Sequence, residues 1–280
     1  MKTIRLVAVA VTIILASTMT AGFAKAQQSS TNTSDDEMKL MAIDGLRGAD
    51  ASVAVPQLEK VLAGNSSDNL KKRALSVLAH EDTPQAREVV ARFAKSQTNP
   101  SLQAEAIRQL GVSGNPDAMK TLSEIYASST DPAIKRSILR AFMVGGDKQR
   151  LLAAAQSEKD PNVRIEAIRL LGAMGSRDAI SQIAMTESSV EVRKAAIRDM
   201  GSMGRGTQSG AELVGLYGKE KDPAVRKEIL HALAMQDDAK DLVDVARKES
   251  DSDLKVYAVR QLSQMRSKEA QDYMMEILSK

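Results

Sequence analysis

The stretch DPNVRIEAIRLLG, from Asp160 to Gly172, decides the fold because its spacing of polar and apolar residues recurs along the chain with different amino acids. DPAIKRSILRAFM begins at Asp131, NPSLQAEAIRQLG at Asn99 and DPAVRKEILHALA at Asp222. The residues three, seven, eight and eleven positions after the leading polar residue are apolar or small. We call these the third, seventh, eighth and eleventh places, and number the other places in the same way. Spacings of three, four and seven residues put these side chains on one stripe of an α-helix. Each stretch is therefore predicted to be an amphipathic helix with one buried face.

The same pattern, in stronger or weaker form, tiles the chain in eight units that begin at Asp35, Ser67, Asn99, Asp131, Asp160, Ser189, Asp222 and Asp251. The leading polar residue is a typical N-cap, and the proline that often follows it fits the first helical position. We expect the glycines at Gly111, Gly172 and Gly201, which follow the last apolar residue, to end these helices in a left-handed turn. A second apolar-periodic segment follows in each unit, for example over residues 118–126 and 179–185.

A helical hairpin of about 30 residues cannot bury its own apolar face, so such units must stack on one another. The pattern D-P-x-[VIL]-[RK]-x-x-A-[IV]-x-x-L-G resembles HEAT repeats, in particular the short repeats of phycobilisome-lyase-type proteins within the armadillo-like helical superfamily. The resemblance covers residues 35–280. It implies an all-α fold, a right-handed α–α superhelix or HEAT-like solenoid of about eight helical hairpins. It implies little about function, because this fold serves many functions.

The first 26 residues are predicted to be a signal peptide: Lys2 and Arg5 precede a short apolar stretch, and Ala24-Lys25-Ala26 has the form of a cleavage site. The polar residues 27–34 are predicted to be a flexible linker before a solenoid over residues 35–280. We therefore expect a periplasmic or secreted protein, and the sequence leaves open whether the segment is cleaved or kept as an anchor.

The net charge argues against nucleic acid as a partner. The chain has 39 Lys and Arg against 36 Asp and Glu, and the excess of three is Lys2, Arg5 and Lys25 in the predicted signal. The remainder is balanced, so neither nucleic-acid binding nor stable membrane insertion after cleavage is expected. The sequence indicates no oligomeric state.

Residues suited to catalysis or metal binding are scarce. The chain has no cysteine and two histidines, His80 and His231, and His80-Glu81 is the single His-Glu pair. We therefore predict no catalytic residues, no metal and no cofactor, and a non-catalytic protein-binding scaffold. The alternative is a cofactor-handling enzyme of the phycobilisome-lyase or deoxyhypusine-hydroxylase-like type, since both resemble this fold.

Two series of basic residues recur at fixed places in the first helix of the units. The fourth place, beside the apolar stripe, holds Lys71, Lys135, Arg164, Arg193, Arg226 and Lys255. The HEAT resemblance implies that these residues pair with the leading Asp of a neighbouring unit. We predict a structural ladder with Asp131, Asp160, Asp222 and Asp251.

The ninth place lies opposite the apolar stripe, and from the third unit onward it holds Arg108, Arg140, Arg169, Arg198, His231 and Arg260. In HEAT repeats the corresponding helix lines the concave side, so the resemblance implies a basic, partner-binding row on the concave face. Arginine offers forked donors that suit carboxylates and phosphates. The predicted partner is a protein, with an acidic segment as the part that fits.

Two alternatives to this binding row stay open. Glu105, Glu166 and Glu228 precede Arg108, Arg169 and His231 by three residues, so local ion pairs on a solvated face would explain the row equally well. The interface could also lie at the extra residues Gly204 to Gly210.

Overall fold

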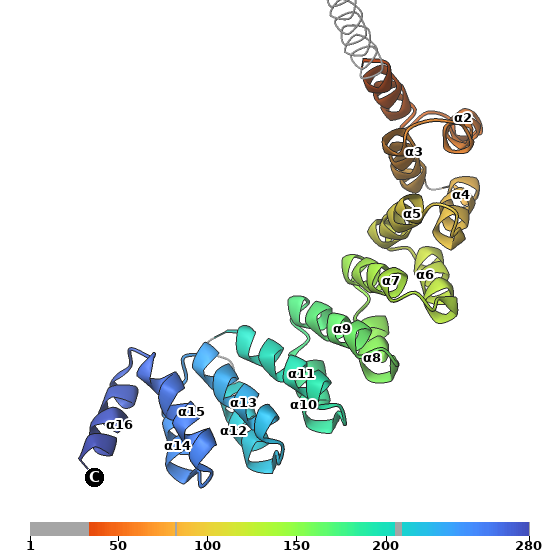
Figure 1. Cartoon of the computed structure of the whole chain (residues 1–280). Helices are drawn as coiled ribbons and strands as arrows, with labels where there is room; N and C mark the ends of the chain where they lie inside the picture. The colour runs from red at the N-terminus through yellow and green to blue at the C-terminus, as the bar shows by residue number, and fades with distance from the viewer. Residues whose placement is uncertain (1–33, 82, 205–208, 280) are drawn as a thin grey trace, which may run out of the picture. The chain divides into compact units, whose positions relative to one another are not determined.

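The computed structural model describes residues 34–81, 83–204 and 209–279, and within these ranges all regular structure is helical (Figure 1). The chain divides into two compact units, Met1–Gln109 and Leu110–Lys280, which we call unit 1 and unit 2 and describe separately. The predicted signal peptide and nearly all of the predicted linker lie outside the described residues, as do residues 205–208 of the extra segment. Ser34 is described and is helical.

Unit 1 begins, in its described part, with a helix over residues 34–45. Its further helices are α2 (Ala51–Ala63), α3 (Asp68–His80), α4 (Pro84–Lys95) and most of α5 (Pro100–Ser113). Helix α3 packs against both α2 and α4, and α2 also touches α4. The buried side chains of α3 include Leu70, Ala74, Leu75 and Leu78, which are the third, seventh, eighth and eleventh places of the pattern.

Unit 2 continues as helical hairpins. Its helices are α6 (Pro116–Ser128), α7 (Pro132–Val144), α8 (Lys148–Ser157), α9 (Pro161–Ala173), α10 (Arg177–Thr186), α11 (Val190–Ser202), α12 (Ser209–Lys219), α13 (Pro223–Met235), α14 (Ala239–Lys248), α15 (Ser252–Ser263) and α16 (Lys268–Leu278). None of the helices described in the chain combines the length and apolar character that crossing a membrane requires.

The helices of unit 2 form two layers (Figure 1). The first helices of successive hairpins touch in series, α7 with α9, α9 with α11, α11 with α13, and α13 with α15. The second helices touch in the same way, for example α8 with α10, α12 with α14, and α14 with α16. We call these the first-helix layer and the second-helix layer.

The stretch from Asp160 to Gly172 shows why these helices form where they do. The Asp160 carboxylate accepts hydrogen bonds from the backbone N–H of Asn162 and Val163, at 2.8 and 3.3 Å, which caps α9. Pro161 takes the first helical position, where no N–H is needed. Along the helix Val163, Ala167, Ile168 and Leu171 are all buried, so the predicted apolar stripe is the core-facing one.

The prediction for the three glycines is wrong. Gly111, Gly172 and Gly201 lie inside α5, α9 and α11, and the left-handed backbone occurs later, for example at Gly114 and Gly175. A Cβ atom on Gly111 would lie 2.7 Å from Cα of Ala141 on α7, and one on Gly201 would lie 2.9 Å from Cα of Ala232 on α13. Glycine at these two places therefore allows neighbouring first helices to approach closely.

Candidate functional site

Four of the fourth-place basic residues of unit 2 lie between hairpins, and each pairs with a glutamate at the end of its own hairpin's second helix. We call these pairs the seam ladder. Its four members are Lys135 with Glu158, Arg164 with Glu187, Arg193 with Glu220, and Arg226 with Glu249. The glutamates are nearly buried, and the basic partners are largely so.

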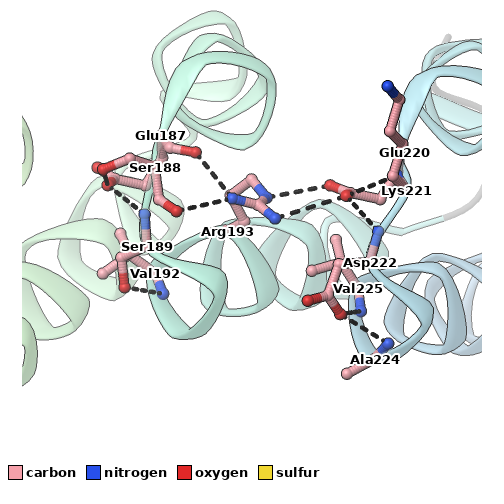
Figure 2. A network of polar contacts seen from close by, with 10 residues as sticks. All are labelled: Glu187, Ser188, Ser189, Val192, Arg193, Glu220, Lys221, Asp222, Ala224 and Val225. Carbon is pink, nitrogen blue, oxygen red and sulfur yellow. Dashed lines mark hydrogen bonds and ion pairs between the residues drawn. The ribbon is translucent and has the colours of Figure 1, made fainter.

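Arg193 shows how one ladder residue ties three segments together (Figure 2). Its Nε donates to Glu220 Oε2 at 3.0 Å, near the end of α12. Its Nη1 donates to the carbonyl oxygens of Glu187 and Ser188, at 3.1 and 2.9 Å, where α10 ends. The exposed side-chain fraction is 14% for Arg193 and 11% for Glu220. This ion pair is therefore mostly removed from water.

Each ladder glutamate also holds the start of the next hairpin. The N–H of Asp222 donates to Glu220 Oε1 at 2.8 Å, and the N–H of Asp251 donates to Glu249 Oε1 at 2.8 Å. Glu158 and Glu187 accept the N–H of Asp160 and Ser189 in the same way. One carboxylate thus links a first helix, a second helix and the next first helix.

The contacts of Glu158 lower the pKa of its carboxyl strongly. Burial alone would raise its pKa, but hydrogen bonds from Lys135 Nζ, from the Tyr126 hydroxyl and from the backbone N–H groups of Asp160 and Lys159 outweigh it. Together they hold the pKa at about 2. Burial and the contact with Glu158 raise the pKa of Tyr126. Glu158 therefore stays charged, and Tyr126 neutral, over the ordinary pH range.

The predicted ladder partners are wrong, although the ladder exists. The leading carboxylates of Asp131, Asp160, Asp222 and Asp251 accept the N–H groups of their own helices instead. The missed signal was in the sequence, because glutamate recurs two residues before the leading residue at Glu158, Glu187, Glu220 and Glu249.

The two remaining fourth-place residues stay outside the ladder. Lys255 Nζ donates to the backbone carbonyl oxygen of Glu249, at 3.5 Å, and pairs with no glutamate side chain among the described residues. Lys71 in unit 1 has no equivalent glutamate, because Gln97 stands two residues before the leading Asn99. The ladder therefore belongs to the hairpins of unit 2.

The ninth-place residues of unit 2 lie along the first-helix layer. We call them the arginine row: Arg140 on α7, Arg169 on α9, Arg198 on α11, His231 on α13 and Arg260 on α15. The four arginines are exposed and His231 is half-buried. Arg108, the sixth predicted member, is also exposed but belongs to unit 1, so the arginine row does not include it.

The local ion pairs expected within each helix form only once among the described residues. Arg108 pairs with Glu105 on its own helix, with Nε 3.0 Å from Oε2. Glu166 and Glu228 turn instead to the preceding hairpin, where Arg140 Nη2 lies 2.8 Å from Glu166 Oε1 and Arg198 Nη2 lies 2.8 Å from Glu228 Oε2. The reason is geometric, because packed first helices bring the next helix within reach of these side chains.

Arg169 differs from its two neighbours in the row, because within the described part of the chain it makes no hydrogen bond or ion pair. Its charge acts on Asp199 of α11, whose Oδ2 is buried and without a hydrogen-bond partner among the described residues. Burial raises the pKa of the Asp199 carboxyl, and the positive charges of Arg169 and Arg198 lower it by less. The Arg169 guanidinium thus has its donors free toward solvent.

The two histidines belong to different units, His80 to unit 1 and His231 to unit 2. His80 Nδ1 lies 2.6 Å from the carbonyl oxygen of Ser76 on its own helix, while Glu81 accepts the N–H of Gly48 at 3.1 Å. His231 Nδ1 faces Gln261 Oε1 at 3.5 Å in unit 2. Over residues 34–81, 83–204 and 209–279, no three His, Cys, Asp or Glu side chains are grouped to hold a metal ion.

Comparison with known proteins supports the repeat assignment. Residues 55–143 match the family model of HEAT repeats, which confirms the predicted repeats over that stretch. The chain is an all-α, HEAT-like solenoid. No curated protein matches it. One similar solved structure is the complex of CpcE and CpcF of phycocyanin lyase from Nostoc sp. PCC7120. It is 21% identical, with a TM-score of 0.34, and the match covers 79% of this chain and 92% of that chain.

The match to a lyase structure contradicts the prediction that the chain is not an enzyme, and that prediction is withdrawn. With a TM-score of 0.34, the match assigns no reaction to this chain either.

Proposed function

We propose that this HEAT-repeat protein binds an acidic segment of a partner protein on the first-helix layer of unit 2. The observation that carries the proposal is the contrast between the two basic series of that layer. The seam ladder is occupied by internal contacts, whereas the arginine row is exposed and one of its arginines, Arg169, has no internal partner among the described residues. A row of exposed guanidinium groups suits carboxylates, which it can bind through two parallel hydrogen bonds.

The internal pairs of Arg140 and Arg198 do not prevent binding. Both arginines are more than half exposed, and exposed ion pairs contribute little to stability. An incoming carboxylate can share these guanidinium groups with Glu166 and Glu228, because arginine carries five N–H donors. The long-range attraction of such a row is screened by salt, so binding should weaken as ionic strength rises.

The test measures binding of a fluorescent oligoglutamate peptide by anisotropy at low and high salt. The variant Arg140→Ser/Arg169→Ser/Arg198→Ser should lose binding, while circular dichroism and the melting temperature stay close to those of the parent chain. Arg247→Ser is the matched control. Arg247 is 50% exposed against 51% for Arg198, and it pairs with Glu276 through Nε and Nη2, but it lies in the second-helix layer.

Two outcomes would contradict the proposal. Unchanged binding by the triple variant would place the interface elsewhere, and equal loss in Arg247→Ser would indicate a general effect of net charge. Heparin or an oligonucleotide could also bind through the same arginines. If either binds more tightly than the acidic peptide, the ligand is a different polyanion and not an acidic protein segment.

We also propose that residues 1–26 direct export, so that binding takes place in the periplasm or outside the cell. The basic start, the apolar stretch and Ala24-Lys25-Ala26 support this. Expression of the full chain in a secreting bacterium, followed by mass spectrometry of its N-terminus, should find a chain that begins near Gln27 in the exported fraction. An intact N-terminus in the cytosolic fraction would contradict export.

A further inference from the structure

We infer that the segment bound by unit 2 is extended and carries a set pattern: an apolar residue, an acidic residue, a second acidic residue and a second apolar residue, each three places after the last. This inference deepens the proposed function and rests on it. The inference follows from the exposed side chains at the ends of α7, α9, α11 and α13, which lie next to the arginine row.

Each of these four helices ends four residues after its row residue. The final residues are Val144, Ala173, Ser202 and Met235, and they follow Arg140, Arg169, Arg198 and His231 in that order. Residues four apart on a helix lie on the same face, one turn from each other. Every first helix therefore offers a bound segment two adjacent side chains, one from the row and one from the helix end.

The two inner helices, α9 and α11, offer charge. Their final residues Ala173 and Ser202 are small and exposed, so the guanidinium groups of Arg169 and Arg198 dominate what a partner meets there. Arg169 has no internal partner within the described residues, so a carboxylate can bind it without displacing another acid. The inner two contacts should therefore be acidic, with the stronger one at Arg169.

The two outer helices, α7 and α13, add exposed apolar surface next to their row residues, and on α7 the Arg140 guanidinium is already paired with Glu166. Val144 is 54% exposed and Met235 is 43% exposed, although both are large apolar side chains. His231 beside Met235 is half-buried and faces Gln261, so it adds less charge than an arginine would. A partner gains free energy by covering this apolar area, in proportion to the area removed from water. The outer two contacts should therefore be apolar.

The spacing of the helices selects the conformation of the segment. Packed helices lie about 8–10 Å apart. A chain in the extended polyproline II conformation has three residues per turn and advances about 3.1 Å per residue, so side chains three places apart lie on one face, about 9 Å from each other. This distance matches one step from one first helix to the next. The four contacts then fall in a segment of about ten residues, because three steps cover roughly 24–30 Å. The pattern reads the same in both chain directions, so the geometry does not fix the direction of binding.

Four synthetic peptides test this inference. The patterned peptide has Leu at its first and tenth places and Glu at its fourth and seventh, with Ser and Gly elsewhere. A second peptide has the same composition with the two Glu residues adjacent. A third has Glu at every third place and no Leu. The fourth is a helix-forming peptide that repeats the same contacts every seven residues, about 10.5 Å along a helix.

At about 0.15 M salt, where distant charges are screened, the patterned peptide should bind about tenfold tighter than the adjacent-Glu and Leu-free peptides. Val144→Ser and Met235→Ser should each weaken its binding about three- to tenfold, and Arg169→Ser by more. Met185→Ser is the matched control, because Met185 is 55% exposed but lies on α10 in the second-helix layer, and it should leave binding unchanged. Circular dichroism checks that each variant is folded.

The outcomes separate the two proposals. If the oligoglutamate peptide binds through the arginine row but the patterned peptide shows no advantage, the inferred pattern is wrong and the proposed function stands. Tighter binding of the helical peptide would overturn the extended conformation. If no acidic peptide binds in a way that depends on the row, both proposals fail.

Discussion

Arg193 and Arg198 lie on the same helix, α11, five residues apart, and their surroundings differ sharply. Arg193 is 14% exposed and is held by Glu220 and two backbone carbonyls. Arg198 is 51% exposed and pairs with Glu228. The difference repeats on α7, where Lys135 is in the seam ladder and Arg140 is in the arginine row.

This comparison shows that the position of a basic residue on its helix, and not the residue type, decides whether its charge is buried and paired or exposed. At the fourth place the neighbouring hairpin removes the charge from water, and such a charge is stable only when it is fully paired. At the ninth place water remains, so an ion pair there is weak. The seam ladder therefore holds hairpins together, while the arginines of the row stay exposed to solvent.

The sharpest test of the comparison is Arg193→Ala. The substitution leaves the nearly buried Glu220 carboxylate without its partner, so the free energy of unfolding should fall by about 3 kcal/mol or more. Chemical denaturation followed by circular dichroism measures this. Arg169→Ala is the control, because Arg169 is exposed and has no internal partner in the described chain. An equal loss in both variants would break the distinction between ladder and row.

Acid should weaken the ladder. The folded pKa of Glu158 is about 2, below its ordinary value of 4.5, so its contribution to stability is complete above about pH 5 and is lost as the pH falls toward 2. The contribution is about 3 kcal/mol. Denaturation midpoints across this range should fall with pH, and more steeply for the parent chain than for Glu158→Gln, which accepts hydrogen bonds without titrating. Parallel curves would contradict this.

Two glycines, each twelve residues after the leading residue of its unit, test how closely neighbouring first helices pack. A Cβ on Gly201 would lie 2.9 Å from Cα of Ala232, whereas one on Gly172 would lie 3.5 Å from Cδ1 of Ile180. Gly201→Ala should therefore destabilise the protein by about 1–3 kcal/mol. Gly172→Ala should be neutral or stabilising by up to about 1 kcal/mol, because alanine favours the helix. Thermal unfolding of the pair checks this, and a reversed order would contradict the close approach of α11 and α13.

The smallest stability effect is expected on the exposed side. Arg198→Ser should change the melting temperature by less than about 3 °C, since exposed ion pairs contribute little. Arg247→Ser, which breaks a similarly exposed pair in the second-helix layer, should behave in the same way. A large loss in Arg198→Ser alone would mean that the arginine row is also structural, and would weaken the case for a binding face.

The sequence alone determined the helices and their cores. N-capping by Asp160, the first-position proline and the stripe of Val163, Ala167, Ile168 and Leu171 are local features, set by residues within one helix of each other. They were sufficient to predict an all-α repeat fold and the exposed ninth place. The repeat itself supplied the stacking, because one hairpin cannot bury its own face.

Tertiary structure decided which partner each charge takes. Arg193 pairs with Glu220 and Arg140 with Glu166, and both partners come from helices that reach them only after the hairpins have packed. The same holds for Gly201, whose role comes from the backbone of Ala232 on the next first helix and not from a turn in its own chain. Helix periodicity fixes which way a side chain points, but the distance to the next helix depends on packing. That distance separates a buried, fully paired arginine from one that stays exposed.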